Sequence, residues 1–317
     1  MHFKNRYRMR KETARFIIQL VEEELGNFEN NRGLPINTDI QVLATLRYLA
    51  KGAYGTEIAD HHGISQPSLS KIAKRVVVAI ARHRERFISF PDYDEQQSIK
   101  ADFYRIAGCP RIVGAIDCTH INIKNPGGDY PVLFINRKGY YSLNVQVVSD
   151  SKCRIRDIVE RWRGSTHDSR IWKESSLKRR FQAGDTTGIL LGDNGYASTR
   201  YLLTPVLNPV TNAENRYNRA HCSTRNVVER LFGIWKNKFR CFFNGLNLKL
   251  ETTKAAIVAA ANVHNIIIND KLENERQDLS DDDNDDEHPD AEDFRVEVED
   301  NAQGNIFRRQ YIQRYFN

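Results

Sequence analysis

The spacing of apolar and polar residues changes along the chain and divides it into segments. Residues 12–25 and 36–90 repeat apolar side chains at helical spacing, and residues 213–268 do so again. Residues 111–210 instead hold short apolar runs bounded by turn residues, with helical stretches between them, which is typical of strands mixed with helices. No internal repeat is visible. This order predicts an α/β fold preceded by a small all-α part.

Two acidic residues interrupt or end the predicted strands of the middle segment. The run "VGAIDCTHINI" places Asp117 inside a predicted buried strand, and "TGILLGDNGYA" leaves its strand for a polar turn at Asp193. Between them lie a predicted hairpin at residues 140–162 and a predicted helix at residues 169–181. An unpaired buried carboxylate is costly, so each acid must pair with a base, reach water at a strand end, or bind a metal ion.

A third carboxylate lies on the predicted helix "STRNVVERLFGIWKNKFRCF". The apolar positions expected to pack inward are Val228, Leu231, Ile234 and Trp235. Glu229, Gly233 and Lys236 form the neighbouring stripe. A glycine at mid-helix lets a helix lie close to a sheet, so we expect Glu229 to lean over the strand ends that carry the two aspartates.

Carboxylates that converge on one sheet edge repel one another unless a cation compensates them. Oxygen ligands suit Mg²⁺ or Mn²⁺, and a pair of such ions suits the cleavage of phosphodiesters. Zinc would require histidine or cysteine ligands, and no set of His120, His167, His221 and Cys222 has the spacing of a zinc finger. These four residues are therefore interpreted as structural or as neighbours of the site.

The stretch "TEIADHHGISQPSLSKIAKRV" has the spacing of a helix-turn-helix. The small core is expected to consist of Ile58, Leu69 and Ile72, and Ala59 is expected to allow close contact between the helices. Gly63 is expected in the turn, and Ser65 is expected to cap the second helix. The residues expected on the exposed face of the second helix, where they would meet DNA, are Gln66, Ser68, Lys71 and Arg75. The alternative is a plain helical hairpin inside a bundle.

The net charge of +6 is distributed unevenly. Residues 270–300 contain 16 Asp and Glu against 3 Lys and Arg, a charge of −13, so the rest of the chain carries +19. A basic body is typical of proteins that bind polyanions, although a merely solvated surface gives the same pattern. The acidic segment either covers the basic surface and competes with phosphates or acts only as a solubility tail.

We therefore predict four parts. Residues 1–35 form a basic helix and loop, residues 36–90 the helix-turn-helix domain, residues 91–269 the α/β domain, and residues 270–317 an acidic, disordered tail. No run of 18 apolar residues and no secretory leader is present, which predicts a soluble intracellular protein. Five cysteines without a C-x-x-C pair indicate reduced thiols.

Several motifs carry a family resemblance. "GAIDCTHI", "GSTHDSRIW", "GDNGYA" and "RNVVERLFGIWKNKFR" occur in this order ahead of "AAANVHNIII". The set resembles the DDE transposase domain of the PIF/Harbinger superfamily, and with the preceding helix-turn-helix it is most similar to the Harbinger transposase-derived nucleases of animals. The resemblance covers residues 35–268. It departs at Asn194, where relatives more often have Ser, which leaves the carboxylates intact.

The resemblance implies an RNase H-like mixed sheet with flanking helices and a catalytic triad of Asp117, Asp193 and Glu229. It adds Asp168 as a fourth acid near the metal site, although Asp168 also fits an ordinary helix cap. The implied cofactor is Mg²⁺ or Mn²⁺. The implied activity is metal-dependent cleavage of DNA, and the alternative is a domesticated DNA-binding or scaffold protein that does not cut.

The resemblance also implies partners and a location. DNA is the expected substrate, with Lys236 added to the expected DNA-binding residues. Family transposases are thought to work with a Myb-like DNA-binding protein, so such a partner is expected here, whereas a homo-oligomer is left open. The expected location is the nucleus, with the cytoplasm as an additional site, and no membrane association is expected.

Overall fold

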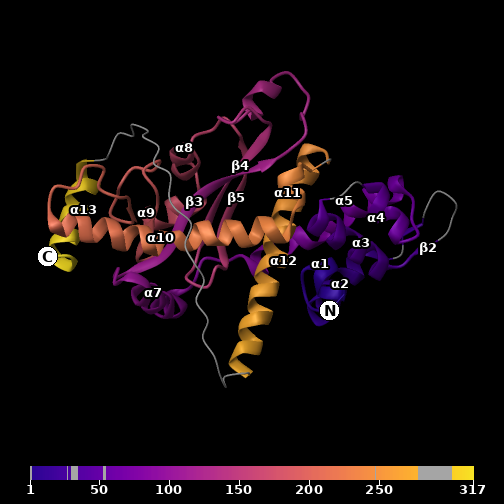
Figure 1. Cartoon of the computed structure of the whole chain (residues 1–317), viewed down its shortest axis with the longest axis horizontal. Coiled ribbons are helices and arrows are strands. Elements are labelled where there is room, and N and C mark those ends of the chain that lie inside the picture. The colour runs from indigo at the N-terminus through magenta and orange to yellow at the C-terminus, as the bar shows by residue number, and fades with distance from the viewer. Residues whose placement is uncertain (1, 27, 30–34, 53–54, 247, 278–301) are drawn as a thin grey trace.

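A five-stranded mixed sheet lies at the centre of the molecule (Figure 1). The computed structural model describes residues 2–26, 28–29, 35–52, 55–246, 248–277 and 302–317. In the order β5-β4-β3-β6-β7, the strands are β5 (Ile155–Arg163), β4 (Ser142–Ser149), β3 (Ile112–Asn122), β6 (Ile189–Leu191) and β7 (Leu202–Leu203). β3, β4 and β5 are antiparallel, whereas β6 and β7 run parallel to β3. The predicted strands and hairpin are confirmed, and the sheet is consistent with a DDE nuclease fold.

The register of the central strand decides which face of the sheet carries Asp117. Asp117 pairs with Val147 of β4, and Cys118 pairs with Gln146. Because side chains alternate along a strand, Asp117 and Ile121 point to one face, and Cys118 points to the other. The charged residue within the apolar run therefore faces only one of the two helical layers.

Helices cover both faces of the sheet. α8 (Asp168–Lys173) and α9 (Ser176–Ala183) cover one face, where Trp172 and Phe181 pack with Val148. The helices of the opposite layer are α7 (Tyr93–Ala107), α10 (Asn212–Lys238) and α12 (Leu250–Gln277). Asp117 faces this second layer, in which α10 packs directly on β3.

The helices that precede the sheet share its hydrophobic core. They are α1 (His2–Tyr7), α2 (Lys11–Leu25), α3 (Thr38–Lys51), α4 (Gly55–His61), α5 (Gln66–Arg82) and α6 (Arg84–Phe87), with a short hairpin of β1 (Phe28–Glu29) and β2 (Pro35–Ile36). One cluster of buried side chains includes Ile17, Val42 and Ile72 as well as Trp235 and Ile257. α5 packs against α12. The hydrophobic core therefore extends across residue 90, where the sequence predicted a boundary between two domains.

The helix-turn-helix pattern corresponds to α4, a turn and α5. Ile58, Ala59 and Leu69 lie in one small core cluster. Gly63 adopts a φ of +64°, which suits glycine. The Ser65 hydroxyl caps α5 by accepting a hydrogen bond from the Ser68 amide at 3.2 Å. The turn and the helix cap are thus as predicted, but Ile72, expected in this small core, belongs to the large core cluster instead.

α10 begins at a capping box and carries the third carboxylate. The Glu214 amide donates to Thr211 Oγ1, and the Glu214 carboxylate accepts from the Thr211 amide, an arrangement that stabilises a helix start by about 1 kcal/mol. Trp235 is fully buried as expected, but Ile234 is exposed. The role expected of Gly233 is also wrong, because a Cβ atom there would contact nothing within 4 Å.

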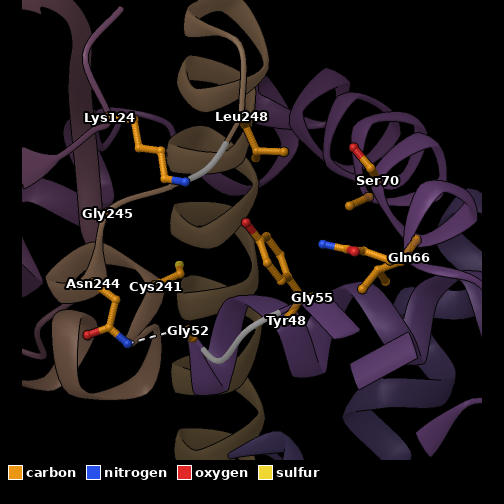
Figure 2. Close-up of a pocket in the computed structure, with 12 residues that line it drawn as sticks. Tyr48, Gly52, Gly55, Gln66, Ser70, Lys124, Cys241, Asn244, Gly245 and Leu248 are labelled. Carbon is orange, nitrogen blue, oxygen red and sulfur yellow. Dashed lines mark hydrogen bonds between the residues drawn. The ribbon is translucent and has the colours of Figure 1, made fainter. Parts of the chain in front are cut away.

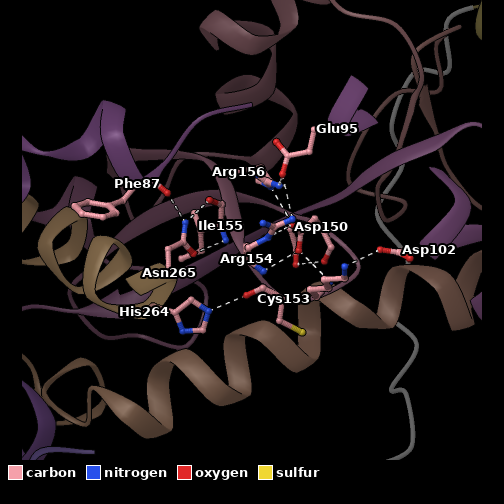
Figure 3. A network of polar contacts seen from close by, with 12 residues as sticks. Phe87, Glu95, Asp102, Asp150, Cys153, Arg154, Ile155, Arg156, His264 and Asn265 are labelled. Carbon is pink, nitrogen blue, oxygen red and sulfur yellow. Dashed lines mark hydrogen bonds and ion pairs between the residues drawn. The ribbon is translucent and has the colours of Figure 1, made fainter. Parts of the chain in front are cut away.

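A buried polar network holds the turn between β4 and β5 (Figure 3). Asp150 accepts hydrogen bonds from the Arg154 and Arg156 side chains at 2.6 and 2.9 Å, and both arginines also reach Glu95 of α7. Asn265 of α12 donates to Ile155 O and accepts from its amide. The network ties the sheet edge to two helices of the covering layer.

The C-terminal part differs from the predicted tail. α12 continues to Gln277, and Asp270 within it accepts hydrogen bonds from Arg10 and Thr13 of the N-terminal region. The prediction of a disordered tail over 270–317 is wrong for α13 (Ala302–Tyr315), which packs against α10. Residues 278–301, which carry most of the acidic charge, lie outside the described residues, so neither hypothesis for the acidic segment is tested.

The short helices complete the description. η1 (Pro131–Phe134) lies between β3 and β4, and α11 (Cys241–Asn244) follows α10. All five cysteines are free. In the described part of the chain, no helix is long and apolar enough to span a membrane.

Candidate active site

Asp117 lies in the middle of β3 and faces α10. Its side chain is 16% exposed, its Oδ1 accepts a hydrogen bond from the Cys118 amide at 2.7 Å, and its Oδ2 accepts one from Arg225 at 3.3 Å. Of the three possibilities that the sequence left open for this buried acid, pairing with a base is therefore observed. The base comes from the helix that carries Glu229.

Asp193 lies just beyond the end of β6, which pairs in parallel with β3. Its Oδ1 accepts a hydrogen bond from the Gly195 amide at 2.9 Å, which holds the carboxylate at the start of the "DNGYA" turn. Burial raises the pKa of Asp193, and the nearby negative charges of Asp168 and Glu229 add to the increase. The sheet therefore brings Asp193 into the same electrostatic environment as the other predicted acids.

Glu229 projects from α10 and is the most accessible acid of the predicted triad. Its side chain is 45% exposed, and its Oε1 accepts a hydrogen bond from Arg225, one helical turn earlier, at 2.5 Å. Arg225 thus donates to Glu229 and to Asp117 at once. A single guanidinium joins the helix carboxylate to the strand carboxylate.

Asp168 approaches the site from the opposite helical layer. It is the first residue of α8, and its Oδ1 accepts a hydrogen bond from Asn144 of β4 at 2.7 Å. His167 is the N-cap residue, but its side chain makes no capping hydrogen bond. Asp168 adds to the rise in the pKa values of Asp117 and Asp193, so it contributes negative charge to the site.

Burial, together with the negative charge of neighbouring carboxylates, favours the protonated forms of Asp117 and Asp193. Burial raises the pKa of Asp117 first, and the negative charge of Asp193 raises it further, while Arg225 acts in the opposite direction. The same carboxylates help to raise the pKa of Arg225, although its burial opposes them. One cation therefore compensates only part of the negative charge, and the site has capacity for more.

The donor chemistry fits a divalent metal ion, but the acids are not arranged as a finished metal site. Among the described residues, no three Asp, Glu, His or Cys side chains come together closely enough to hold an ion. All four predicted ligands offer carboxylate oxygens, which Mg²⁺ and Mn²⁺ prefer. Arg225 lies between two of them, so we expect it to move for an ion to bind.

Lys236 lies two helical turns beyond Glu229 on α10 and contacts β3, the strand that carries Asp117. Its Nζ donates a hydrogen bond to the His120 carbonyl at 3.0 Å, and its side chain is partly buried. Burial, with the positive charge of Lys138, lowers the pKa of Lys236 to about 8. The expected DNA-binding lysine thus contacts the strand that carries Asp117, three residues further along it.

The residues of α5 expected to meet DNA occupy different environments. Gln66 and Lys71 are exposed, but Ser68 is 7% exposed and contacts the Ser65 hydroxyl, contrary to its expected position on the outer face. Arg75 donates to the Leu25 carbonyl and lies over the Phe28 ring at 5.1 Å. Because its side chain is buried, Ser68 is not available to contact a DNA base.

A cleft separates the start of α5 from the end of β3 (Figure 2). It has a volume of about 530 Å³. Gln66 and Ser70 line one side and Lys124 and Asn244 the other, with Tyr48 between them. The polar side chains of α5 therefore face the region that follows the active-site strand.

The central part of the chain matches a family model described as "DDE superfamily endonuclease" over residues 116–265. This range includes all four predicted site acids. Together with the mixed sheet and its flanking helices, the match defines the class as a DDE-type nuclease fold.

Comparison with curated proteins identifies the family within that class. "Putative nuclease HARBI1" of Rattus norvegicus is 35% identical over 79% of this chain and 73% of the relative, and the Homo sapiens protein of that name is 36% identical over 79% and 74%. The chain belongs to the Harbinger transposase-derived nuclease family. "Protein ALP1-like" of Arabidopsis thaliana is 24% identical over 84% of this chain and 70% of the relative. No solved structure matches the chain.

Sequence reasoning missed Arg225 and Asn144, which contact the predicted acids. Arg225 precedes Glu229 by four residues, and this i, i+4 spacing of opposite charges is a detectable signal. Its second contact with Asp117, and the contact of Asn144 with Asp168, depend on the tertiary fold. No pattern along the chain predicts them.

Proposed function

We propose that the protein is a metal-dependent DNA endonuclease whose catalytic residues are Asp117, Asp193 and Glu229. The main support is that these acids and Asp168 lie close enough, at the junction of β3, β6 and α10, for their charges to affect one another. Four carboxylates compensated by one guanidinium are costly in a partly buried site unless a cation binds there. Membership of the Harbinger-derived nuclease family supports the same reading.

Each residue has a distinct part in the proposed reaction. Asp117 and Asp193, which are held by backbone amides, would hold metal ions with Glu229, and Asp168 would add a further oxygen. A bound pair of Mg²⁺ or Mn²⁺ ions would lower the pKa of the attacking water and stabilise the negative charge on the leaving oxygen. Arg225, released from Asp117, would then be free to attract the phosphate to be cut.

The direct test is the cleavage of supercoiled plasmid in the presence of Mg²⁺ or Mn²⁺. We expect nicked and linear products from the wild-type protein and none from Asp193→Asn, because removal of one ligand charge weakens metal binding while the strand end stays packed. The metal-free variant should melt at or above the wild-type temperature, because one repelling charge is gone. Cutting by a folded Asp193→Asn protein would exclude Asp193 as a catalytic residue.

A second candidate is a DNA-binding or scaffold protein that keeps the fold without cutting. The pairing of Arg225 with Asp117 and Glu229 favours it, since a guanidinium held among the acids opposes metal binding. In that case the wild-type protein would bind duplex DNA but leave the plasmid intact at every metal concentration. Calorimetry with Mn²⁺ alone would show no binding.

DNA contacts are proposed on α5 and on α10. Gln66 would meet the duplex at the cleft. Lys71 and Arg75 would meet it on another side of α5, where they line a hollow with Leu25 and Phe28, and Lys236 would contact it from α10. Arg75 would have to leave the Leu25 carbonyl to do so. Glutamine substitutions of Lys71 and Lys236 should each weaken DNA binding across sequences, as expected for phosphate contacts.

The partner and location remain proposals from the family. We propose a nuclear protein, with a cytoplasmic fraction, that acts with a Myb-like DNA-binding protein. Co-purification from nuclear extract should recover a protein with Myb repeats. Autonomous nuclear import together with no such protein would contradict this proposal.

A further inference from the structure

A basic turn lies in the connection between β3 and β4, which projects from the sheet (Figure 1). We define the basic turn as residues 136–139, of which Arg137 and Lys138 are exposed. No sequence motif singled out this segment. Its hydrogen bonding, its position and the absence of acidic partners among the described residues all point to a ligand.

The basic turn is held in one conformation by a buried side chain. Asn136 is 5% exposed, its Oδ1 accepts hydrogen bonds from the Lys138 and Tyr140 amides at 2.9 and 3.4 Å, and its Nδ2 donates to Ser142 Oγ at 3.1 Å. Gly139 has a φ of +80°, which the turn requires. The two basic side chains are therefore presented from a fixed backbone.

The basic turn lies beside the active-site acids. Arg137 Nη2 is 2.7 Å from His167 Nε2, and His167 directly precedes Asp168. His120 connects the other side, because its ring contacts Ser142 Oγ at 3.1 Å and its carbonyl accepts from Lys236 at 3.0 Å. Cations from the basic turn and from α10 thus lie around His120, on the side of the site where Asp168 is found.

These cations are not compensated by acids of the protein. In the described part of the chain, Arg137, Lys138 and Lys236 form no ion pair with Asp or Glu, whereas Arg225 forms two. Lys138 and Lys236 are close enough that the charge of Lys138 contributes to the lowered pKa of Lys236, after burial. Like charges held together without a counter-ion favour the binding of an anion.

We infer that the basic turn and Lys236 form a phosphate-binding subsite that holds the DNA backbone next to the scissile bond. The inference rests on the proposed function, because only a nucleic acid substrate would place a phosphate beside the acids. The rigid turn would fix the register of the strand, as phosphate contacts generally do. The exposed Arg137 side chain would exchange its His167 contact for a charge-assisted bond to phosphate.

The test measures DNA binding rather than cleavage. Labelled duplex DNA would be titrated by fluorescence anisotropy at several salt concentrations, with all proteins carrying Asp193→Asn to prevent cutting. Arg137→Gln combined with Lys138→Gln should weaken binding and reduce the slope of log affinity against log salt by about 1.8, since each phosphate contact contributes about 0.9. Arg137→Lys combined with Lys138→Arg should preserve the slope.

A control removes the same charge elsewhere. Lys173→Gln combined with Arg179→Gln alters exposed cations of α8 and α9 and should leave the slope nearly unchanged. An equal loss in both double variants, or an unchanged slope in the turn variant, would overturn the subsite. A loss seen only with RNA would overturn the assignment to DNA. Failure of the proposed nuclease would appear separately, as an intact plasmid with metal.

Discussion

Arg225 neutralises part of the negative charge that the fold concentrates beside β3. Its side chain is 16% exposed, and its guanidinium contacts Asp117 and Glu229 together. In such a site, removing one partner of an ion pair leaves the other charge uncompensated, which costs more than the pair itself contributes. The metal-free protein therefore depends on this arginine, whereas the metal-bound protein should not.

Arg225→Gln should separate these two states. We expect the metal-free variant to lose on the order of 1–3 kcal/mol of unfolding free energy, a value reduced from that of fully buried pairs because the site is partly open to water. Mn²⁺ should bind the variant more tightly, since no guanidinium has to leave Asp117. Urea unfolding without metal and titration calorimetry with Mn²⁺ measure the two effects.

Arg225→Lys is the matched control, because it keeps one positive charge but cannot bridge two carboxylates in the same geometry. It should fall between the wild type and Arg225→Gln in both measurements. Equal Mn²⁺ affinity in all three proteins would show that Arg225 does not oppose the metal.

The sequence predicted acids better than it predicted their partners. A charge within an apolar run breaks a strong rule of burial, so Asp117 was visible from the sequence alone. Its partner was not, because the distance from Arg225 to β3 is set by how α10 packs on the sheet. Ser68 failed for a related reason: its spacing is that of an outward residue, but the capping contact with Ser65 draws it inward.

At the scale of elements, α13 packs against α10 and against the loop after β7. Tyr311 and Phe316 pack around the ring of Tyr217 on α10. Arg308 donates to Thr204 Oγ1 and to Pro205 O, both at 2.9 Å, in the loop after β7. The helix thereby supports the segment that follows the Asp193 turn.

Gly304→Ala should detach α13 without unfolding the sheet. A Cβ atom at this position would lie 1.8 Å from Ser198 O, a backbone atom that cannot move easily. Overpacking of this kind typically costs about 1–3 kcal/mol, which we expect to be released by undocking of the helix. Trypsin should then cut at Arg308 and Arg309 faster than in the wild type.

Ile306→Ala is the control on the same helix, because Ile306 is 55% exposed. Its cleavage rate should match that of the wild type. Unchanged proteolysis of Gly304→Ala would mean that α13 does not depend on this close contact.

Strands could be predicted more completely than this helix. The longer strands carry apolar runs that are visible in the sequence, and the pairing of β4 with β5 follows from the short turn at Asp150–Cys153. α13 follows a strongly acidic stretch and buries only a few residues, among them Tyr311 and Ile312. Its helix is stabilised by contacts with α10, so composition alone indicated a tail.

At the scale of the whole molecule, one continuous core joins the N-terminal helices to the layer that covers the sheet. Asn262 of α12 donates to Ile80 O at 2.8 Å, and His264 Nε2 donates to Cys153 O at 2.8 Å. The same helix therefore contacts both α5 and the β4–β5 turn. Substitutions that disturb the packing of α12 should therefore lower the free energy of unfolding of the whole protein.

Two histidines that are buried in the described part of the chain, His221 and His264, make that stability depend on pH. Burial lowers the pKa values of His264 and His221 to about 3, whereas an unfolded histidine titrates near 6.5. Between these values the unfolded chain binds more protons than the folded one. The contribution to stability is therefore present above pH ~6.5 and is lost as the pH falls towards ~3, by about 1.4 kcal/mol per pH unit and histidine.

His264→Gln should remove one of these two contributions. Glutamine can still donate to Cys153 O but does not titrate, so the acid-induced loss of stability should become shallower by about 1.4 kcal/mol per pH unit relative to the wild type. Carboxylates contribute equally to both proteins, so the difference between the two curves isolates His264. Urea unfolding at several pH values below ~6.5 measures it, with His83→Gln, at the end of α5, as the control. Parallel curves for the wild type and His264→Gln would show that His264 does not stay neutral in the folded core.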